Sequence, residues 1–153
     1  MSNGTCYKPR LIVLAGLPGS GKTTWAERQG YTVISSDEMR RLLIDDAADQ
    51  SIHGRVFAAL RYLLRHRMEL QRPVTCLDAT NITRRDRRGW IKMAELYGCV
   101  PEAVFFDVSV EECLKRNAAR GRVVPEEAIR MMAAKLSAPS AEEGFASITV
   151  IRP

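Results

Sequence analysis

The chain has 153 residues, 46% of them hydrophobic, and it carries a formal net charge of +5 at pH 7. This length and apolar content predict a single domain, 1–153, with a hydrophobic core of its own, and exclude a small disulfide-stapled scaffold. No apolar run approaches the roughly 20 residues of a membrane span, and 1–10 lacks an apolar signal core. We therefore expect a cytoplasmic protein with no membrane partner.

Arginine dominates the positive charge, since only five of the 23 basic residues are lysines. The planar guanidinium group binds phosphate oxygens bidentately, which permits a nucleic-acid partner. A genome whose base composition favours arginine codons explains the same bias equally well. The charge alone therefore does not establish that partner.

The first predicted strand covers 11–15 and follows a segment, 1–9, that we expect to be loosely ordered. Directly after this strand, the sequence GLPGSGKT at 16–23 matches the phosphate-loop pattern G-x-x-x-x-G-K-[ST] without mismatch. A helix can continue over 24–28. The motif thus stands between a strand and a helix, as its chemistry requires.

This motif predicts a nucleoside triphosphate site, because its glycines let backbone amides turn toward phosphates at a helix N-terminus. Lys22 would reach the β- and γ-phosphates, and the Thr23 hydroxyl would hold Mg²⁺. We therefore expect ATP as phosphate donor and Mg²⁺ as cofactor. The alternative interpretation is a flexible glycine turn. The loop residues expected to bind ATP are Gly16, Pro18, Gly19, Ser20, Gly21, Lys22, Thr23 and Thr24.

A second strand is predicted at 32–35, and Ser35 and Glu38 then have capping-box spacing for a helix. Asp37 can be interpreted as an ordinary acidic residue of a first helical turn. In a doubly wound sheet, however, it lies at the carboxyl end of a strand, where it could accept a proton from an attacking hydroxyl. Arg40 would share a helix face with Asp37 and either pair with it or hold a substrate phosphate.

Apolar residues at helical spacing predict an amphipathic helix over 52–70. Its histidines, His53 and His66, have no partner at metal-ligand spacing, so we interpret both as exposed. The next strand is predicted at 74–78 and ends in Asp78. A carboxylate at the end of an apolar strand that follows a phosphate loop acts on Mg²⁺ directly or through its waters.

Residues 80–83 predict a turn and a helix cap, followed by a helix that ends at Gly98. Four arginines open this helix and either face an anionic substrate or form a solvated first turn: Arg84, Arg85, Arg87 and Arg88. The sequence shows no aromatic platform for stacking bases beyond isolated residues such as Tyr62, Trp90 and Tyr97.

A fourth strand is expected to begin after Pro101, and a last strand covers 147–151. Strands that alternate with helices predict an α/β fold with a parallel sheet of about five strands flanked by helices. Two helices are predicted between the last strands, and the arginines Arg116, Arg120 and Arg122 fall between them. Many small kinases fold a lid over the nucleotide at this place. We expect a lid at about 116–136, with Arg116 and Arg120 in contact with ATP.

Several segments in order resemble the 5′-hydroxyl polynucleotide kinases, particularly the kinase module of bacterial end-healing enzymes and the phage enzyme. The segments are GLPGSGKTTWA, ISSDEMR, DDAADQ, LDATN, LKRNAARG and EGF. The resemblance covers nearly the whole chain. It implies a phosphate-loop kinase fold with a helical lid, and transfer of the γ-phosphate of ATP to 5′-hydroxyl ends of RNA or DNA, as in nucleic-acid repair.

The resemblance also implies a role for each matched position. Asp37 matches the general base that contacts the attacking 5′-hydroxyl, and Arg40 matches the arginine that holds the phosphate next to the terminal nucleoside. Arg120 matches the lid arginine that stabilises charge on the transferring phosphate, and with Lys22 these residues form the expected catalytic set. The DxTN segment would organise the metal and acceptor pocket through Asp78, Thr80 and Asn81.

The bacterial end-healing enzymes join this module to phosphatase and nucleotide-transfer domains, whereas this chain ends at Pro153. We therefore expect a stand-alone kinase or an excised module, associated with phosphatase or ligase modules. Two other functions stay open, because one fold serves many chemistries. The first is a kinase for small hydroxyl compounds such as sugars or antibiotics, and the second is an ATP-binding switch protein without a phosphoryl acceptor.

Overall fold

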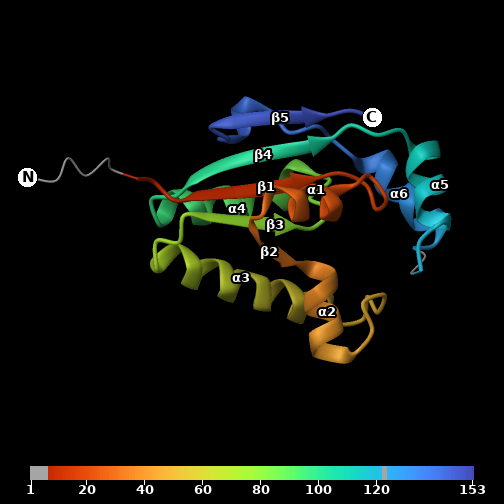
Figure 1. The fold of residues 1–153 in the computed structure, drawn as a ribbon, viewed down its shortest axis with the longest axis horizontal. Coiled ribbons are helices and arrows are strands. Elements are labelled where there is room, and N and C mark those ends of the chain that lie inside the picture. Colours follow the sequence, from red (N-terminus) through yellow and green to blue (C-terminus); the bar gives the residue numbers. More distant parts are fainter. Residues whose placement is uncertain (1–6, 122–123) are drawn as a thin grey trace, which may run out of the picture.

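The computed structural model describes residues 7–121 and 124–153. Within these ranges the strands form one five-stranded parallel sheet in the order β2-β3-β1-β4-β5 (Figure 1). The strands are β1 Arg10–Ala15, β2 Thr32–Ser35, β3 Val74–Asp78, β4 Val100–Phe106 and β5 Ser147–Ile151. The predicted α/β fold with a parallel sheet of about five strands is confirmed.

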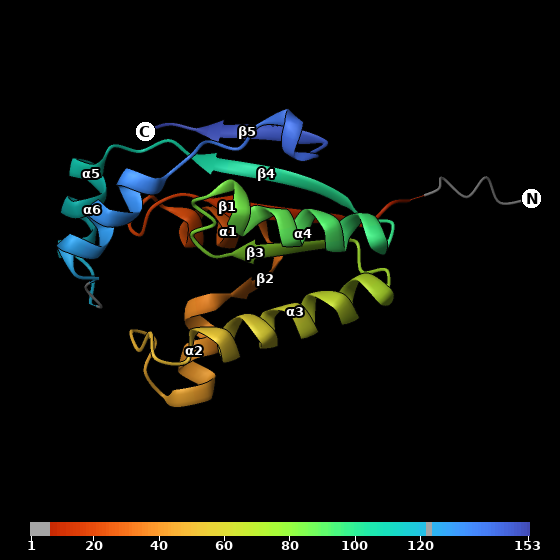
Figure 2. The same cartoon turned by 180° about the vertical axis from the view of Figure 1, so that it is seen from behind.

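Helices cover both faces of this sheet (Figure 1 and Figure 2). The helices are α1 Lys22–Gln29, α2 Ser36–Ile44, α3 His53–Glu69, α4 Arg84–Leu96, α5 Val110–Ala118 and α6 Glu126–Lys135, with a 3₁₀ turn η1 at Ala141–Glu143. Leu11 and Val13 of β1 pack with buried side chains of α3 and α4, whereas Ile12 and Leu14 pack with those of α1, α5 and α6. Successive strand residues point to opposite faces, so β1 is apolar on both.

Strand β4 begins at Val100, so the expectation that it starts after Pro101 is wrong. The carbonyl of Pro101 accepts a hydrogen bond from the Ala146 N–H at 2.8 Å, on the side of the sheet where β5 lies. Pairing with β5 starts only at Glu102, opposite Ser147. Pro101 has no N–H to donate, but it precedes the residues that pair with β5, so no hydrogen bond between strands is lost. Proline is tolerated at such positions of a strand.

Parts of two expected segments lie outside the described residues: 1–6 of the N-terminal segment, and 122–123 of the lid, including Arg122. Of the remaining N-terminal residues, Pro9 is buried and its carbonyl accepts a hydrogen bond from the Val100 N–H at 2.8 Å. Among the described residues, no helix has both the length and the apolar character needed to cross a bilayer.

The order of the strands indicates at which edge of the sheet a ligand site is expected. Strand β1 lies between β3 and β4, and the chain connects β1 through α1 to β2 on one side before β4 continues on the other. All strands run in parallel, so their carboxyl ends share the edge of the sheet next to α2, α5 and α6 (Figure 1). In open α/β sheets, ligands bind at the carboxyl edge where the order reverses.

Candidate active site

The phosphate loop joins β1 to α1 at this edge, and its shape depends on glycine. Gly19 and Gly21 have φ angles of +83° and +98°, in the left-handed region that favours glycine. A Cβ at Gly19 would also lie 2.6 Å from the carbonyl oxygen of Cys113 in α5. The loop therefore turns tightly and packs directly on α5. Its backbone amides lie at the start of α1.

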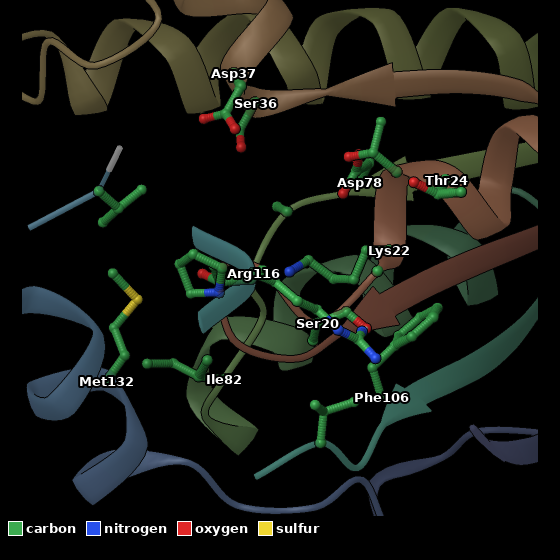
Figure 3. Close-up of a pocket in the computed structure, with 18 of the residues that line it drawn as sticks. Ser20, Lys22, Thr24, Ser36, Asp37, Asp78, Ile82, Phe106, Arg116 and Met132 are labelled. Carbon is green, nitrogen blue, oxygen red and sulfur yellow. The ribbon is translucent and has the colours of Figure 1, made fainter. Parts of the chain in front are cut away.

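A cavity of about 910 Å³ opens over this loop. Figure 3 shows Asp37 and Asp78 along one wall, Ile82 and Met132 facing them, and Lys22 pointing into the space between. Nearly all residues expected to bind ATP or substrate line it, in the phosphate loop, α2, the end of β3 and the α5–α6 region. Gly16 and Asn81 are the expected site residues that do not line it.

Lys22 is buried, and its Nζ donates hydrogen bonds to the carbonyls of Gly16 and Leu17 at 2.9 and 2.8 Å. Burial lowers the pKa of Lys22, while the carboxylates of Asp78 and Asp37 act in the opposite direction. These charges interact because β2 and β3 end beside the phosphate loop. The ammonium group is therefore held at the centre of the site by groups that phosphate oxygens can replace.

The pair formed by Thr23 and Asp78 fits a magnesium site. Thr23 Oγ1 donates a hydrogen bond to Asp78 Oδ2 at 2.6 Å, and Asp78 is buried. Hydroxyl and carboxylate oxygens are the ligands that Mg²⁺ prefers. In the part of the chain that the structure describes, no three His, Cys, Asp or Glu side chains cluster to hold a metal. An ion here would thus take its other ligands from phosphate and water.

Asp37 and Arg40 come from the first two turns of α2, directly after β2. The Ser35 hydroxyl caps this helix by accepting a hydrogen bond from the Glu38 N–H at 3.3 Å, as the capping-box spacing predicts. Arg40 Nη1 donates to Asp37 Oδ1 at 3.2 Å, and Arg40 is only 4% exposed. Of the two alternatives for Arg40, the structure shows the pairing with Asp37, and both residues line the same cavity as Lys22.

Two buried side-chain atoms of the described residues have no hydrogen-bond partner: Ser20 Oγ and Arg40 Nε. Both residues line the cavity, one in the phosphate loop and the other in α2. A buried polar group without a partner costs about 1–3 kcal/mol, so such groups are rare in folded proteins. Their positions at the two ends of the site fit one ligand at the loop and another at α2.

The expected lid arginines approach the loop from α5 and the turn after it. Arg116 Nη1 donates to the Ser20 carbonyl at 3.4 Å, and its Nε donates to Glu112 at 3.1 Å. Arg120 is exposed, lines the cavity and contributes to lowering the pKa of Lys22.

The sequence did not single out Asn117, which is buried in α5. Its Oδ1 accepts a hydrogen bond from the Val124 N–H at 3.0 Å, and its Nδ2 donates to the Val124 carbonyl at 2.7 Å.

Asn81 is placed behind the cavity wall, although a substrate contact was expected for it. Its Nδ2 donates to the Leu14 carbonyl at 2.7 Å, and its Oδ1 accepts a hydrogen bond from Trp90 Nε1 at 3.0 Å. Next to it, the Thr80 carbonyl accepts from the Gly16 N–H at 2.9 Å. Asn81 therefore fixes the connection after β3 to the strand that carries the phosphate loop.

The four arginines at the start of α4 have different environments, so neither interpretation of them holds for all four. Arg84, Arg85 and Arg88 are exposed, whereas Arg87 is completely buried. The Arg87 guanidinium donates to Glu143 at 2.8 and 3.1 Å and to the carbonyls of Asn81 and Ser137 at 2.8 and 3.0 Å. Arg87 thus joins α4, η1 and the segment after α6.

Comparison with known proteins places this fold and loop in a family. A family model described as an AAA domain, AAA_33, matches residues 11–139. The chain belongs to this AAA domain family. The match starts in β1 and includes the phosphate loop, the Asp37–Arg40 pair and all six helices of the described chain.

A curated relative of this AAA domain is a bifunctional polynucleotide phosphatase/kinase of Schizosaccharomyces pombe (strain 972 / ATCC 24843), 25% identical over 147 residues. The alignment covers 90% of the chain and 32% of the relative. The chain therefore spans about a third of the length of that relative.

Solved structures show how widely the fold is shared. A chain of the Pnkp1/Rnl/Hen1 RNA repair complex superposes with a TM-score of 0.74 at 24% identity, covering 89% of this chain and 46% of that one. Chaetomium thermophilum Kti12 in complex with ADP-AlF3 gives 0.72 at 18% identity, with 93% and 88% covered. A gluconokinase from Sinorhizobium meliloti 1021 gives 0.62 at 20% identity, with 94% and 82% covered. The likeness to polynucleotide kinases inferred from the sequence is confirmed for the fold.

Proposed function

We propose that this AAA domain is an ATP-dependent kinase that transfers the γ-phosphate to the 5′-hydroxyl end of RNA or DNA, with 1–153 as one kinase domain and about 116–136 as its lid. The observation that carries the proposal is the Asp37–Arg40 pair. It lines the cavity opposite the phosphate loop, and the buried Arg40 keeps one donor, Nε, without a partner among the described residues. The identity to the curated phosphatase/kinase supports the same acceptor class.

On the acceptor side, Asp37 acts as general base. As the 5′-oxygen forms its bond to the γ-phosphorus and the bond to the ADP oxygen breaks, the Asp37 carboxylate takes the hydroxyl proton. The 3.2 Å hydrogen bond from Arg40 orients that carboxylate. Arg40 also donates to a phosphate of the acceptor strand, because a guanidinium donates to several oxygens at once.

On the donor side, Lys22 exchanges its two carbonyl partners for phosphate oxygens and neutralises charge that develops during transfer. Thr23 and Asp78 would hold Mg²⁺, which when bound neutralises the β- and γ-phosphates. Arg120 contributes a further positive charge from the lid side of the cavity, and Arg116 steadies the loop through the Ser20 carbonyl.

The test is transfer of labelled γ-phosphate to an oligonucleotide with a 5′-hydroxyl, beside the same strand with a 5′-phosphate. We expect label on the hydroxyl strand alone, and a loss of about 100-fold or more in kcat for Asp37→Asn, with ATP binding retained. Glu38→Gln is the matched control, because Glu38 follows Asp37 in the same helix but pairs with the exposed Arg41 outside the cavity. Near-normal turnover by Asp37→Asn would remove it from this role.

A second candidate, a kinase for small hydroxyl compounds, is supported by the likeness to the gluconokinase, which extends over 94% of this chain. The same assay with gluconate and simple sugars separates the two. Label on a sugar and on neither strand would replace the polynucleotide proposal. Slow ATP hydrolysis without any labelled acceptor would instead favour a nucleotide-dependent switch.

We also propose that the domain works together with phosphatase or ligase modules. Two likenesses support this: the curated relative is a bifunctional phosphatase/kinase of which this chain matches only a third, and a chain of similar fold belongs to an RNA repair complex. Co-elution of the purified chain with such modules on size exclusion is the direct measurement. Separate elution at micromolar concentrations would count against a stable association.

A further inference from the structure

Two aromatic side chains of α3 line the same cavity as Asp37 and Arg40. His53 and Phe57 occupy the first two turns of α3, one helical turn apart, and both line the cavity. Their ring centroids are 4.4 Å apart and their planes are tilted by 31°. This is a stacked arrangement in which the exposed His53 covers the partly buried Phe57.

The stack continues into the core. The Phe57 and Trp90 centroids are 6.2 Å apart with a similar tilt of 32°, and Trp90 is only 4% exposed. Trp90 Nε1 donates to Asn81, which in turn bonds the carbonyl of Leu14 in β1. The rings are thereby tied to the strand that carries the phosphate loop. Such a fixed surface loses little conformational freedom when a ligand stacks on it.

We propose that the His53–Phe57 pair is the stacking platform for the terminal nucleobase of the acceptor strand. The inference rests on the proposed function and names the recognition element of the same site. A terminal nucleoside carries its base and its 5′-hydroxyl on one ribose, so a base held against His53 directs the hydroxyl into the cavity that Asp37 lines. Every base has a π-face, so this contact recognises a nucleoside end without reading its sequence.

A second histidine on the same helix provides the comparison. His66 also contacts an aromatic ring, with its centroid 4.4 Å from that of Tyr62 and the two planes tilted by 56°, but neither residue lines the cavity. Substitution of His66 removes from α3 an imidazole with a ring contact of the same centroid distance, but outside the cavity. His66→Ala is therefore the matched control for His53→Ala.

The experiment measures transfer kinetics on two 5′-hydroxyl strands, one with an ordinary terminal nucleoside and one with an abasic terminal sugar. Base stacking on an aromatic side chain corresponds to about a fivefold to 150-fold change in affinity. We expect His53→Ala to raise KM for the base-bearing strand by about tenfold, with kcat within about twofold of wild type. KM for the abasic strand should be the same in both proteins. His53→Trp should restore the low KM, and His66→Ala should leave both strands unchanged.

A binding measurement tests the contact without turnover. With 2-aminopurine as terminal base, we expect wild type and His66→Ala to quench its fluorescence and His53→Ala to quench it much less. If wild type labels both strands with equal KM, or if His53→Ala affects them equally, the platform is refuted while the proposed function stands. If wild type labels neither strand, the proposed function fails and this inference fails with it.

Discussion

Two buried arginines of this protein, Arg87 and Arg40, differ in how completely their guanidinium groups are hydrogen-bonded. Arg87 has hydrogen bonds from Nε, Nη1 and Nη2 to a carboxylate and two carbonyls. Arg40 is almost as buried, but it donates one hydrogen bond to Asp37 and its Nε has no partner among the described residues. Removing one partner of a buried, fully hydrogen-bonded ion pair is strongly destabilising, whereas a buried donor without a partner beside a cavity indicates a ligand. We therefore expect substitution of Arg87 to lower the stability of the protein and substitution of Arg40 to lower its activity.

The largest effect is expected from Arg87→Met, which leaves the buried Glu143 carboxylate without its partner. Breaking a buried ion pair on one side costs about 3–5 kcal/mol, and we expect a loss of that order in the free energy of unfolding. Urea denaturation measures it. Arg88→Met is the matched control, because the next residue of the same helix is exposed and should change stability by less than about 0.5 kcal/mol. Equal losses in the two variants would contradict the structural role of Arg87.

Arg40→Met should have the next largest effect, and it should appear in catalysis. Losing charged hydrogen bonds to a substrate phosphate costs about 1.5–3 kcal/mol, so we expect kcat/KM for the acceptor strand to fall by about 10-fold to 150-fold. The free energy of unfolding should fall less than in Arg87→Met. Arg41→Met is the control, since Arg41 is exposed and pairs with Glu38. If Arg40→Met loses as much free energy of unfolding as Arg87→Met but keeps full activity, Arg40 has a structural role and not the proposed role in substrate binding.

The smallest effect is a pH dependence. Burial alone would raise the pKa of Glu143, but hydrogen bonds from Arg87 and the Ser140 N–H hold it below its usual value. A carboxyl whose pKa is depressed by folding stabilises the protein above its unfolded pKa, and this contribution is lost as the pH falls through the folded pKa. We expect the free energy of unfolding to fall more steeply between about pH 5 and pH 3 in wild type than in Glu143→Gln. Parallel pH profiles would show that the pair contributes nothing to acid stability.

The sheet and the phosphate loop could be predicted because their signals are local. Strands such as 32–35 and 74–78 are short apolar runs bounded by glycine, proline or aspartate, and the structure has them at the predicted residues. The capping of α2 by Ser35 is equally local. These features depend on neighbours within a few residues, which periodicity and turn chemistry describe well.

The role of Arg87 could not be predicted, because its partner Glu143 lies 56 residues further along the chain. A partial signal existed, since Arg87 has helical spacing with the apolar residues Trp90, Ile91 and Ala94, all of which are buried. The stack of His53 on Phe57 has i,i+4 spacing, which is readable. The position of these two rings in the cavity depends on how α3 packs beside α2. This packing is a property of the tertiary structure, so it could not be predicted from the spacing.

The close approach of Gly19 to Cys113 limits how this protein can change over evolution. The phosphate loop rests on the backbone of α5, at a point where even a methyl group would collide with a carbonyl oxygen. The turn between β4 and α5 therefore acts as a spacer of fixed length, and its Val108 also lines the cavity. Insertions at 107–109 should be tolerated poorly, and a lineage that lengthened this turn would have to rebuild its phosphate loop.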